Sequence, residues 1–154
     1  MGGNGIIRLQ SVEETFAFGA HVAKYFAATG AILALNGELG TGKTSFVQGL
    51  ALGLGIDKLI QSPTFGYLNI HEGTCPLYHF DLYRMKGPAD FFSMGFEESF
   101  DSGGIVAIEW AERLANKLPF QTIGFHFLHE KKERIVRLLS SLDRNLVELL
   151  SKWA

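Results

Sequence analysis

One stretch of the sequence combines glycine, lysine and threonine at a spacing suited to holding phosphate. Residues 37–44 read Gly-Glu-Leu-Gly-Thr-Gly-Lys-Thr and fit G-x-x-x-x-G-K-[ST] at every fixed position. The glycines let the backbone curl so that successive N–H groups point inward at phosphate oxygens. Lys43 supplies a charge for the β- and γ-phosphates, and the Thr44 hydroxyl can coordinate Mg²⁺. The segment is therefore predicted to bind a nucleotide polyphosphate with Mg²⁺.

The sequence on either side of this loop predicts a strand before it and a helix after it. Residues 31–35 form a short apolar run, which is typical of a strand buried on both faces of a sheet. The helix expected over 43–52 adds its positive dipole end to the phosphate site. A glycine-rich turn that binds nothing is the alternative, and the agreement of pattern and context argues against it. The predicted nucleotide-binding residues are Gly37, Glu38, Leu39, Gly40, Thr41, Gly42, Lys43, Thr44 and Ser45.

Two carboxylates that follow other predicted strands are candidates for the rest of a Mg²⁺ site. Asp81 follows the run 77–80, and Glu109 comes directly after four apolar residues, in the manner of a Walker B acid. We expect Thr44, Glu109 and Asp81 to be metal ligands. Asp81 could instead pair with Arg84, and Glu109 could balance the dipole of a helix after it. Either carboxylate could also act on the attacking water.

Other polar and aromatic residues near these motifs have more than one interpretation. The loop 62–64, Ser-Pro-Thr, could sense the γ-phosphate or Mg²⁺, or could be an ordinary turn. His79 is more typical of a packing or supporting histidine than of a metal ligand. Trp110 could lie against a nucleotide or a partner, or could pack in the core. His126 and His129 lack the further ligands that a zinc site needs.

Composition limits the classes of partner. The 154 residues include 14 Lys and Arg against 16 Asp and Glu, a net charge of −2, which is a poor match to a protein that wraps nucleic acid by itself. Any role on RNA would run through a partner. The longest apolar run, 31–35, is too short to cross a bilayer, and the N-terminus does not resemble a signal peptide. A cytoplasmic protein without membrane contact is expected.

The remaining elements predict an α/β three-layer fold with a mixed, partly antiparallel sheet. Strands are expected at 6–9, 67–71, 77–83 and 105–108, and 122–128 with 134–139 should form a hairpin. Ser11 and Glu14 form a capping box that opens a helix ending at Gly30. The expected apolar face of that helix is Phe16, Ala20, Ala23 and Ala27. Shorter helical segments are expected from Pro88 and over 111–118, and a terminal helix carries Leu142, Leu146, Leu149 and Trp153 on one side.

Three further runs follow the phosphate loop in a distinctive order. They are Ser62-Pro63-Thr64-Phe65, His79-Phe80-Asp81-Leu82-Tyr83-Arg84, and residues 104–114, GIVAIEWAERL. With the phosphate loop, they make the chain resemble the TsaE (YjeE) family, the P-loop ATPases of bacterial tRNA threonylcarbamoyladenosine biosynthesis. The resemblance extends from the first predicted strand to about Pro119. The run 91–96 departs from it, since the family usually has a Leu-Gly pair there, which puts partner contact at that place in question.

This resemblance implies a single P-loop ATPase domain over residues 1–154 that binds ATP and Mg²⁺. It implies that Thr44 and Glu109 are Mg²⁺ ligands and that Lys43 binds phosphate. Asp81 and the 62–64 loop, including Thr64, would be needed for hydrolysis. ATP turnover in such proteins supports threonylcarbamoyl transfer to the adenosine next to the anticodon by TsaB and TsaD. The ATPase would act on that complex and reach tRNA only indirectly.

Three other functions remain as alternatives. A small-molecule or nucleoside kinase of the P-loop class usually carries an arginine-rich lid, whereas Arg84 and Arg113 are the only arginines between the loop and Pro119. A GTPase would need an Asn-Lys-x-Asp guanine reader, and residues 116–119 lack the acid. A nucleotide-dependent assembly factor with negligible turnover alone is compatible with the sequence, because a partner could complete the site.

Overall fold

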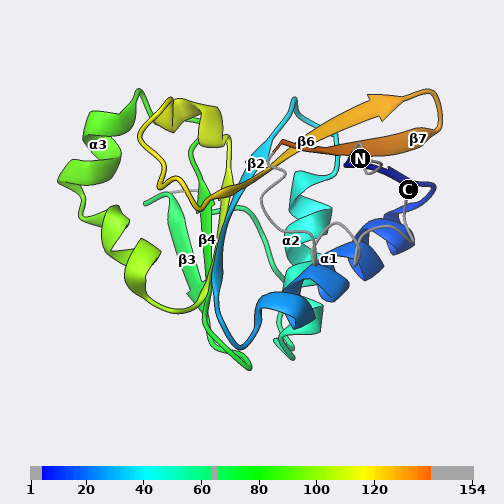
Figure 1. Ribbon diagram of the computed structural model, residues 1–154, viewed down its shortest axis with the longest axis horizontal. Coiled ribbons are helices and arrows are strands. Elements are labelled where there is room, and N and C mark those ends of the chain that lie inside the picture. Colours follow the sequence, from blue (N-terminus) through cyan, green and yellow to red (C-terminus); the bar gives the residue numbers. More distant parts are fainter. Residues whose placement is uncertain (1–4, 64–65, 140–154) are drawn as a thin grey trace.

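The protein folds around one mixed sheet in a computed structural model that describes residues 5–63 and 66–139. The elements in chain order are β1 (Ile6–Leu9), α1 (Val12–Phe26), β2 (Ala31–Asn36), α2 (Lys43–Gly53), β3 (Leu68–His71), β4 (Leu77–Asp81), α3 (Pro88–Ser93), the 3₁₀ segment η1 (Phe96–Asp101), β5 (Ile105–Glu109), the 3₁₀ segment η2 (Ala111–Leu114), β6 (Ile123–Glu130) and β7 (Glu133–Leu138). Helices cover both faces of the sheet (Figure 1). The predicted three-layer α/β fold is confirmed.

The seven strands lie in the order β1-β7-β6-β2-β5-β4-β3. The middle four, β6, β2, β5 and β4, are parallel, while β3, β7 and β1 add antiparallel pairs at the edges. In this register Leu35 of β2 and Asp81 of β4 both pair with Glu109 of β5. The carboxyl ends of β2, β5 and β4 therefore meet at one edge of the sheet, which is where parallel α/β sheets bind ligands.

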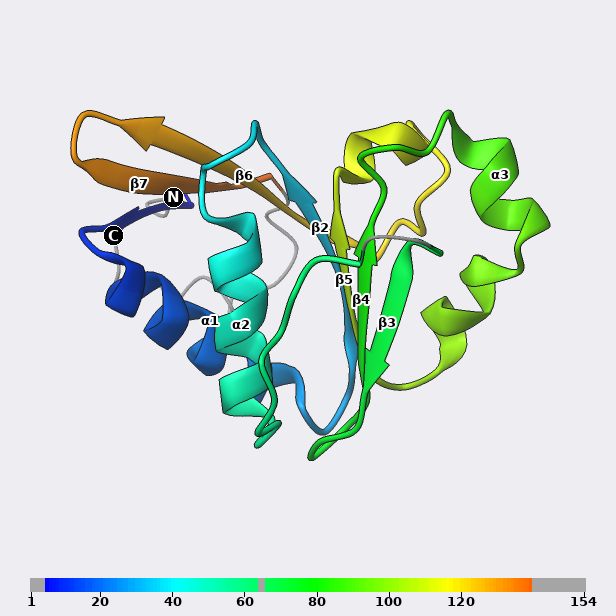
Figure 2. The ribbon, with the colours of Figure 1, turned by 180° about the vertical axis from the view of Figure 1, so that it is seen from behind.

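Helices α1 and α2 pack closely against each other and against one face of the sheet (Figure 2). Glycines allow the close approach: a Cβ on Gly19 would lie 2.4 Å from the Phe46 carbonyl oxygen, and one on Gly49 would lie 2.3 Å from that of Phe16. Because real Cβ atoms do not approach backbone so closely, any larger residue at either position would push the helices apart. The position of α2 depends on this contact, and with it the position of the loop before α2.

The apolar face predicted for α1 was confirmed at Ala23, which is buried, and at Ala27, which packs partly buried against the core, but Phe16 and Ala20 are not among the buried residues. The buried residues of α1 are Thr15, Phe18, Gly19, Val22, Ala23 and Phe26. A glycine contributes nothing to an apolar stripe, yet Gly19 lies at the centre of the contact with α2, so the hydrophobic pattern alone selected a neighbouring face. The predicted cap is present, because Ser11 Oγ accepts a hydrogen bond from the Glu14 amide at 3.1 Å.

The other face of the sheet is covered by a phenylalanine-rich cluster around α3 and η1. Phe91 is fully buried, and its ring centroid lies 5.3 Å from that of Phe80, 5.5 Å from that of Phe96 and 5.7 Å from that of Phe100. The run 91–96, which departs from the family pattern, thus supplies core residues to this layer. Its phenylalanines hold β4 in place from the side away from α2.

Several predicted boundaries changed. The helix expected over 111–118 is only the 3₁₀ segment η2, which ends at Leu114 because the next residue, Ala115, has a φ of 51°. Strands β3 and β4 are shorter than expected, because the chain turns at Tyr67 and leaves the sheet after Asp81. The terminal helix predicted from Leu142 lies outside the described residues.

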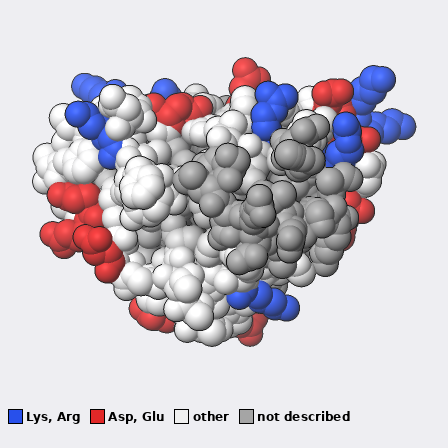
Figure 3. Space-filling model, in the orientation of Figure 1, with Lys and Arg blue, Asp and Glu red and all other residues white. Residues whose placement is uncertain are grey.

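On the face drawn in Figure 3, basic and acidic side chains are interspersed.

Candidate functional site

The loop between β2 and α2 has the curled backbone that its glycines predict. Gly37, Gly40 and Gly42 have φ of 137°, 78° and 106°, a region that L side chains rarely adopt. At Gly37 a side chain would also clash, since a Cβ would lie 2.5 Å from the Phe127 carbonyl oxygen. The loop therefore presents bare backbone at the start of α2, which suits close approach by a phosphate chain.

Lys43, the first residue of α2, lies buried at the base of this loop. Its ammonium donates a hydrogen bond to the Gly37 carbonyl and lies 3.7 Å from the centroid of the Trp110 ring. Burial lowers the pKa of Lys43, and the nearby carboxylates, Glu109 first, oppose that shift. A buried cation held by one carbonyl and an aromatic face is poorly compensated. Phosphate oxygens would provide the missing negative partners.

Glu109 ends β5 and is buried beside the first turn of α2. The Thr44 hydroxyl donates to its two carboxylate oxygens at 3.2 and 3.4 Å, and Ser62 Oγ lies 3.3 Å from Thr44 Oγ1. Glu109 is the last residue of β5 and directly precedes Trp110, the N-cap of η2, so this position is compatible both with a metal ligand and with an acid that balances the dipole of the next segment. A hydroxyl and a carboxylate in contact at the phosphate loop are oxygen ligands of the kind that Mg²⁺ prefers, with phosphate and water filling the other positions.

His79 lies directly behind Glu109. Its Nε2 is 2.6 Å from Glu109 Oε2, and the side chain is completely buried. An ionised carboxylate can only accept, so Nε2 carries the proton and donates. The other ring nitrogen, Nδ1, is buried without a hydrogen-bond partner. His79 thus orients the carboxylate and does not face the cavity, in agreement with the interpretation as a supporting residue.

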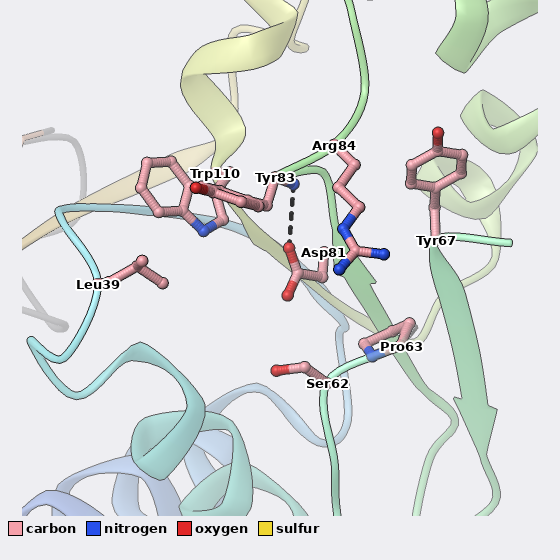
Figure 4. Close-up of a pocket in the computed structure, with 8 residues that line it drawn as sticks. All are labelled: Leu39, Ser62, Pro63, Tyr67, Asp81, Tyr83, Arg84 and Trp110. Carbon is pink, nitrogen blue, oxygen red and sulfur yellow. Dashed lines mark hydrogen bonds between the residues drawn. The ribbon is translucent and has the colours of Figure 1, made fainter. Parts of the chain in front are cut away.

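Asp81 lies beside Glu109 at the end of β4. Its Oδ1 accepts a hydrogen bond from the Tyr83 amide at 3.0 Å (Figure 4). Burial raises the pKa of Asp81, while that amide hydrogen bond lowers it. Among the described residues no ion pair joins Asp81 to Arg84, so the pairing considered from the sequence is not present. The carboxylate remains available to a ligand.

Asp81 and Trp110 line two adjoining cavities of about 220 and 210 Å³. The first is lined by part of the phosphate loop, Thr44 and Glu109. The other lies between the segment Ser62–Pro63 and Arg84 (Figure 4). Leu39, Ser62, Asp81 and Trp110 line both, so the two cavities adjoin at these four residues.

Trp110 closes one side of the site and has an unusual backbone. Its φ of 60° and ψ of 41° are left-handed, which is uncommon for a residue with a side chain. The ring contacts Tyr83 at a centroid distance of 4.9 Å, and Arg113 donates to the Tyr83 carbonyl oxygen at 3.0 Å. These contacts hold the Trp110 ring over Lys43. Trp110 also packs against the apolar cluster around Phe80, so core packing is confirmed, and contact with a nucleotide stays a prediction.

The sequence comparisons agree on one family. The family profile described as "Threonylcarbamoyl adenosine biosynthesis protein TsaE" matches residues 9–137. The chain belongs to the TsaE family. The tRNA threonylcarbamoyladenosine biosynthesis protein TsaE of Treponema pallidum is 43% identical over 114 residues, which cover 74% of this chain and 84% of that protein. The TsaE of Bacillus subtilis is 41% identical over 113 residues, covering 73% and 70%.

A solved structure supports the TsaE assignment. The crystal structure of YdiB from Bacillus subtilis matches with a TM-score of 0.78 at 32% sequence identity, and the match covers 96% of this chain and 93% of that one. Membership in the TsaE family places the protein in tRNA threonylcarbamoyladenosine biosynthesis. None of the described helices is long and apolar enough to cross a membrane.

The structure brings most of the predicted site residues of this TsaE chain together. Lys43, Thr44, Asp81 and Glu109 share one cavity with Ser45 and much of the glycine-rich loop. Thr64 lies outside the described residues, so its role stays a prediction. Arg134 also lines the cavity, and sequence reasoning missed it because it lies on β7, far along the chain from every motif. Its only signal was a basic residue near the hairpin turn.

Proposed function

We propose that the protein binds ATP and Mg²⁺ at the β2–α2 loop and hydrolyses ATP slowly, in support of threonylcarbamoyl transfer to the tRNA adenosine next to the anticodon. The observation that carries this proposal is the contact of Thr44 with Glu109 beside three left-handed glycines and a buried lysine. That donor set suits a metal-bound polyphosphate better than any uncharged ligand. Family membership supplies the tRNA pathway.

Each residue then has a defined task. Lys43 leaves the Trp110 ring to bind the β- and γ-phosphates, and loop amides bind the phosphate oxygens. Thr44 and Glu109 would hold Mg²⁺, with Asp81 beside them, and the ion would supply positive charge next to the phosphates. His79 keeps the Glu109 carboxylate oriented through its Nε2 hydrogen bond.

Asp81 is the residue best placed to orient the attacking water. Glu109 is engaged by Thr44 and His79, whereas Asp81 lies where the two cavities join. The water oxygen bonds to the γ-phosphorus, the bond from that phosphorus to the bridging oxygen breaks, and the water proton passes to Asp81 or solvent. ADP and inorganic phosphate are the products.

We propose that a complex of the TsaB–TsaD type is the partner and raises the rate. A net charge of −2 does not favour direct binding of tRNA by this chain. The rim of the site exposes Leu39 and Tyr83, which are 71% and 46% accessible and available for a partner. A kinase is disfavoured because, of the two arginines that follow the loop before Pro119, Arg113 is already bonded to the Tyr83 carbonyl.

A phosphate-release assay tests the proposal. The purified chain with ATP and Mg²⁺ should release inorganic phosphate slowly, and adding TsaB and TsaD type proteins should increase the rate. Transfer of phosphate to an added nucleoside or sugar instead of water would support a kinase. Equal rates with and without the partners would contradict the partner proposal while leaving ATP hydrolysis intact.

A further inference from the structure

Strand β7 brings an arginine to the phosphate loop from the side opposite the acids. The order β7-β6-β2-β5-β4 places the β2–α2 loop between the β6–β7 hairpin on one side and β5 with β4 on the other. The hairpin extends alongside this loop in both ribbon views (Figures 1 and 2). Arg134 and Val136 point to the same face by strand alternation, and Val136 is buried in the core beneath α1 and α2. Arg134 therefore lies on the face that carries α2.

The Arg134 side chain crosses directly over the N-terminal end of α2. A Cβ built on Gly42 would lie 3.0 Å from Arg134 Cδ and 3.3 Å from Arg134 Nε. Gly42 also has φ of 106°, so backbone conformation and the arginine both favour glycine at this position. Arg134 lines the same cavity as Lys43 and Thr44. The cavity is thus bordered by cationic side chains from two separate parts of the chain.

Arg134 has an unused hydrogen-bond donor at this place. Its Nε is buried and has no hydrogen-bond partner, and none of the ion pairs between described residues involves Arg134. A guanidinium stays charged in proteins, and a buried donor without an acceptor is costly. Lys43 differs, since its ammonium has the Gly37 carbonyl. The geometry therefore lacks an anionic acceptor beside Arg134.

We propose that Arg134 is a nucleotide-binding residue that contacts the phosphate nearer the nucleoside. The inference rests on the proposed function. Thr44, Glu109 and Asp81 mark the metal and γ-phosphate end on the β5–β4 side, so a cation that reaches the loop from β7 meets the other end of the polyphosphate. Arg134 then contributes equally to ADP and ATP, and its contribution does not require Mg²⁺. Nucleotide binding also ties the β6–β7 hairpin to α2.

Calorimetry on Arg134→Ala tests this inference, with ADP and a non-hydrolysable ATP analogue as probes. A hydrogen bond from a charged donor predicts affinities roughly tenfold to a hundredfold weaker for both nucleotides. The same loss should appear with EDTA in place of Mg²⁺. Arg134→Lys, which keeps the charge but not the planar fork, should retain part of the affinity. Arg137→Ala is the matched control, because Arg137 is exposed, lies on the same strand and does not line the cavity.

The outcomes separate the two proposals. If the parent binds nucleotide and Arg134→Ala binds it equally well, the Arg134 inference is overturned while the proposed function stands. A loss for ATP alone, or only with Mg²⁺, would also overturn it, because that would place Arg134 at the metal end. If the parent binds neither nucleotide, the proposed function itself fails. Thermal unfolding of each variant without nucleotide shows whether weaker binding reflects a damaged fold.

Discussion

Replacing Glu109 with glutamine separates the hydrogen bonds that its carboxylate makes in the fold from its proposed role as a Mg²⁺ ligand. Glu109 Oε2 accepts from His79 Nε2 at 2.6 Å and from Thr44 Oγ1 at 3.4 Å, so the single oxygen of a glutamine, placed where Oε2 is, can accept both bonds without the charge. A hydrogen bond to a charged group stabilises by about 1.5–3 kcal/mol and a neutral one by about 1 kcal/mol. The difference is about 0.5–2 kcal/mol for each of the two bonds, so we expect Glu109→Gln to lower the free energy of unfolding by at most about 4 kcal/mol, measured by urea denaturation.

The effect on metal-dependent binding should be much larger. Mg²⁺ favours anionic oxygen ligands, and an amide oxygen is a weak substitute. In calorimetry, Glu109→Gln should bind ATP in EDTA as tightly as the parent does, but Mg²⁺ should no longer increase its affinity. Loss of one preorganised electrostatic contact typically slows turnover by about 10²–10³-fold. Phosphate release should fall within that range.

A matched control shows whether the effect depends on the position of Glu109 or follows from any Glu-to-Gln substitution. Glu72 is exposed in the turn between β3 and β4, outside both cavities that contain Asp81, so Glu72→Gln should match the parent in every assay. The reasoning would be refuted if Mg²⁺ tightened ATP binding by Glu109→Gln as much as it does for the parent. Glu109 would then be a structural partner of His79 and Thr44 and not a metal ligand.

Further predictions concern stability, acidity and fluorescence. Because burial raises the pKa of Asp81, its contribution to the free energy of unfolding should fall as pH rises through the acid range, so in pH-dependent denaturation the stability of Asp81→Asn relative to the parent should increase over that range. A difference between the two proteins that does not change with pH would contradict this. Phe91→Ala removes a fully buried ring and should cost about 3–5 kcal/mol in urea denaturation, whereas an unchanged midpoint would contradict its place in the core. Bound nucleotide should draw the Lys43 ammonium away from its position 3.7 Å from the centroid of the Trp110 ring. The sequence has two tryptophans, so a Trp153→Phe variant reports on Trp110 alone, and its fluorescence emission should change when ADP is added. Emission that does not change would argue against that movement.

The sequence predicted those parts of the site that local patterns encode. The glycine spacing of the phosphate loop and the apolar runs before it and before Glu109 each occupy one short segment, and parallel pairing then brings the carboxyl ends of β2, β5 and β4 together. The strands, the hairpin and the Ser11 cap followed from similar local rules. The layered fold and most of the site were therefore predictable from residue order alone.

The features that were missed depend on contacts between distant segments. The buried face of α1 depends on the close contact of Gly19 with α2, and a hydrophobic pattern does not detect glycine because it has no side chain. The segment 111–118 has helical character, but the positive φ of Trp110 before it and of Ala115 within it limits it to one short 3₁₀ turn. Arg134 lies on β7 and lines the cavity at the phosphate loop. Nothing in the sequence next to Arg134 indicates this contact.

Calorimetric titration of ADP and of a non-hydrolysable ATP analogue into the parent chain and into Lys43→Ala tests the central claim most directly. Lys43 lies buried at the base of the loop, and its ammonium is the full charge assigned to the β- and γ-phosphates. We predict that the parent binds both nucleotides and that Lys43→Ala binds each at least roughly tenfold more weakly while remaining folded. Nucleotide affinity left intact in Lys43→Ala would contradict the assignment of this loop as the phosphate site.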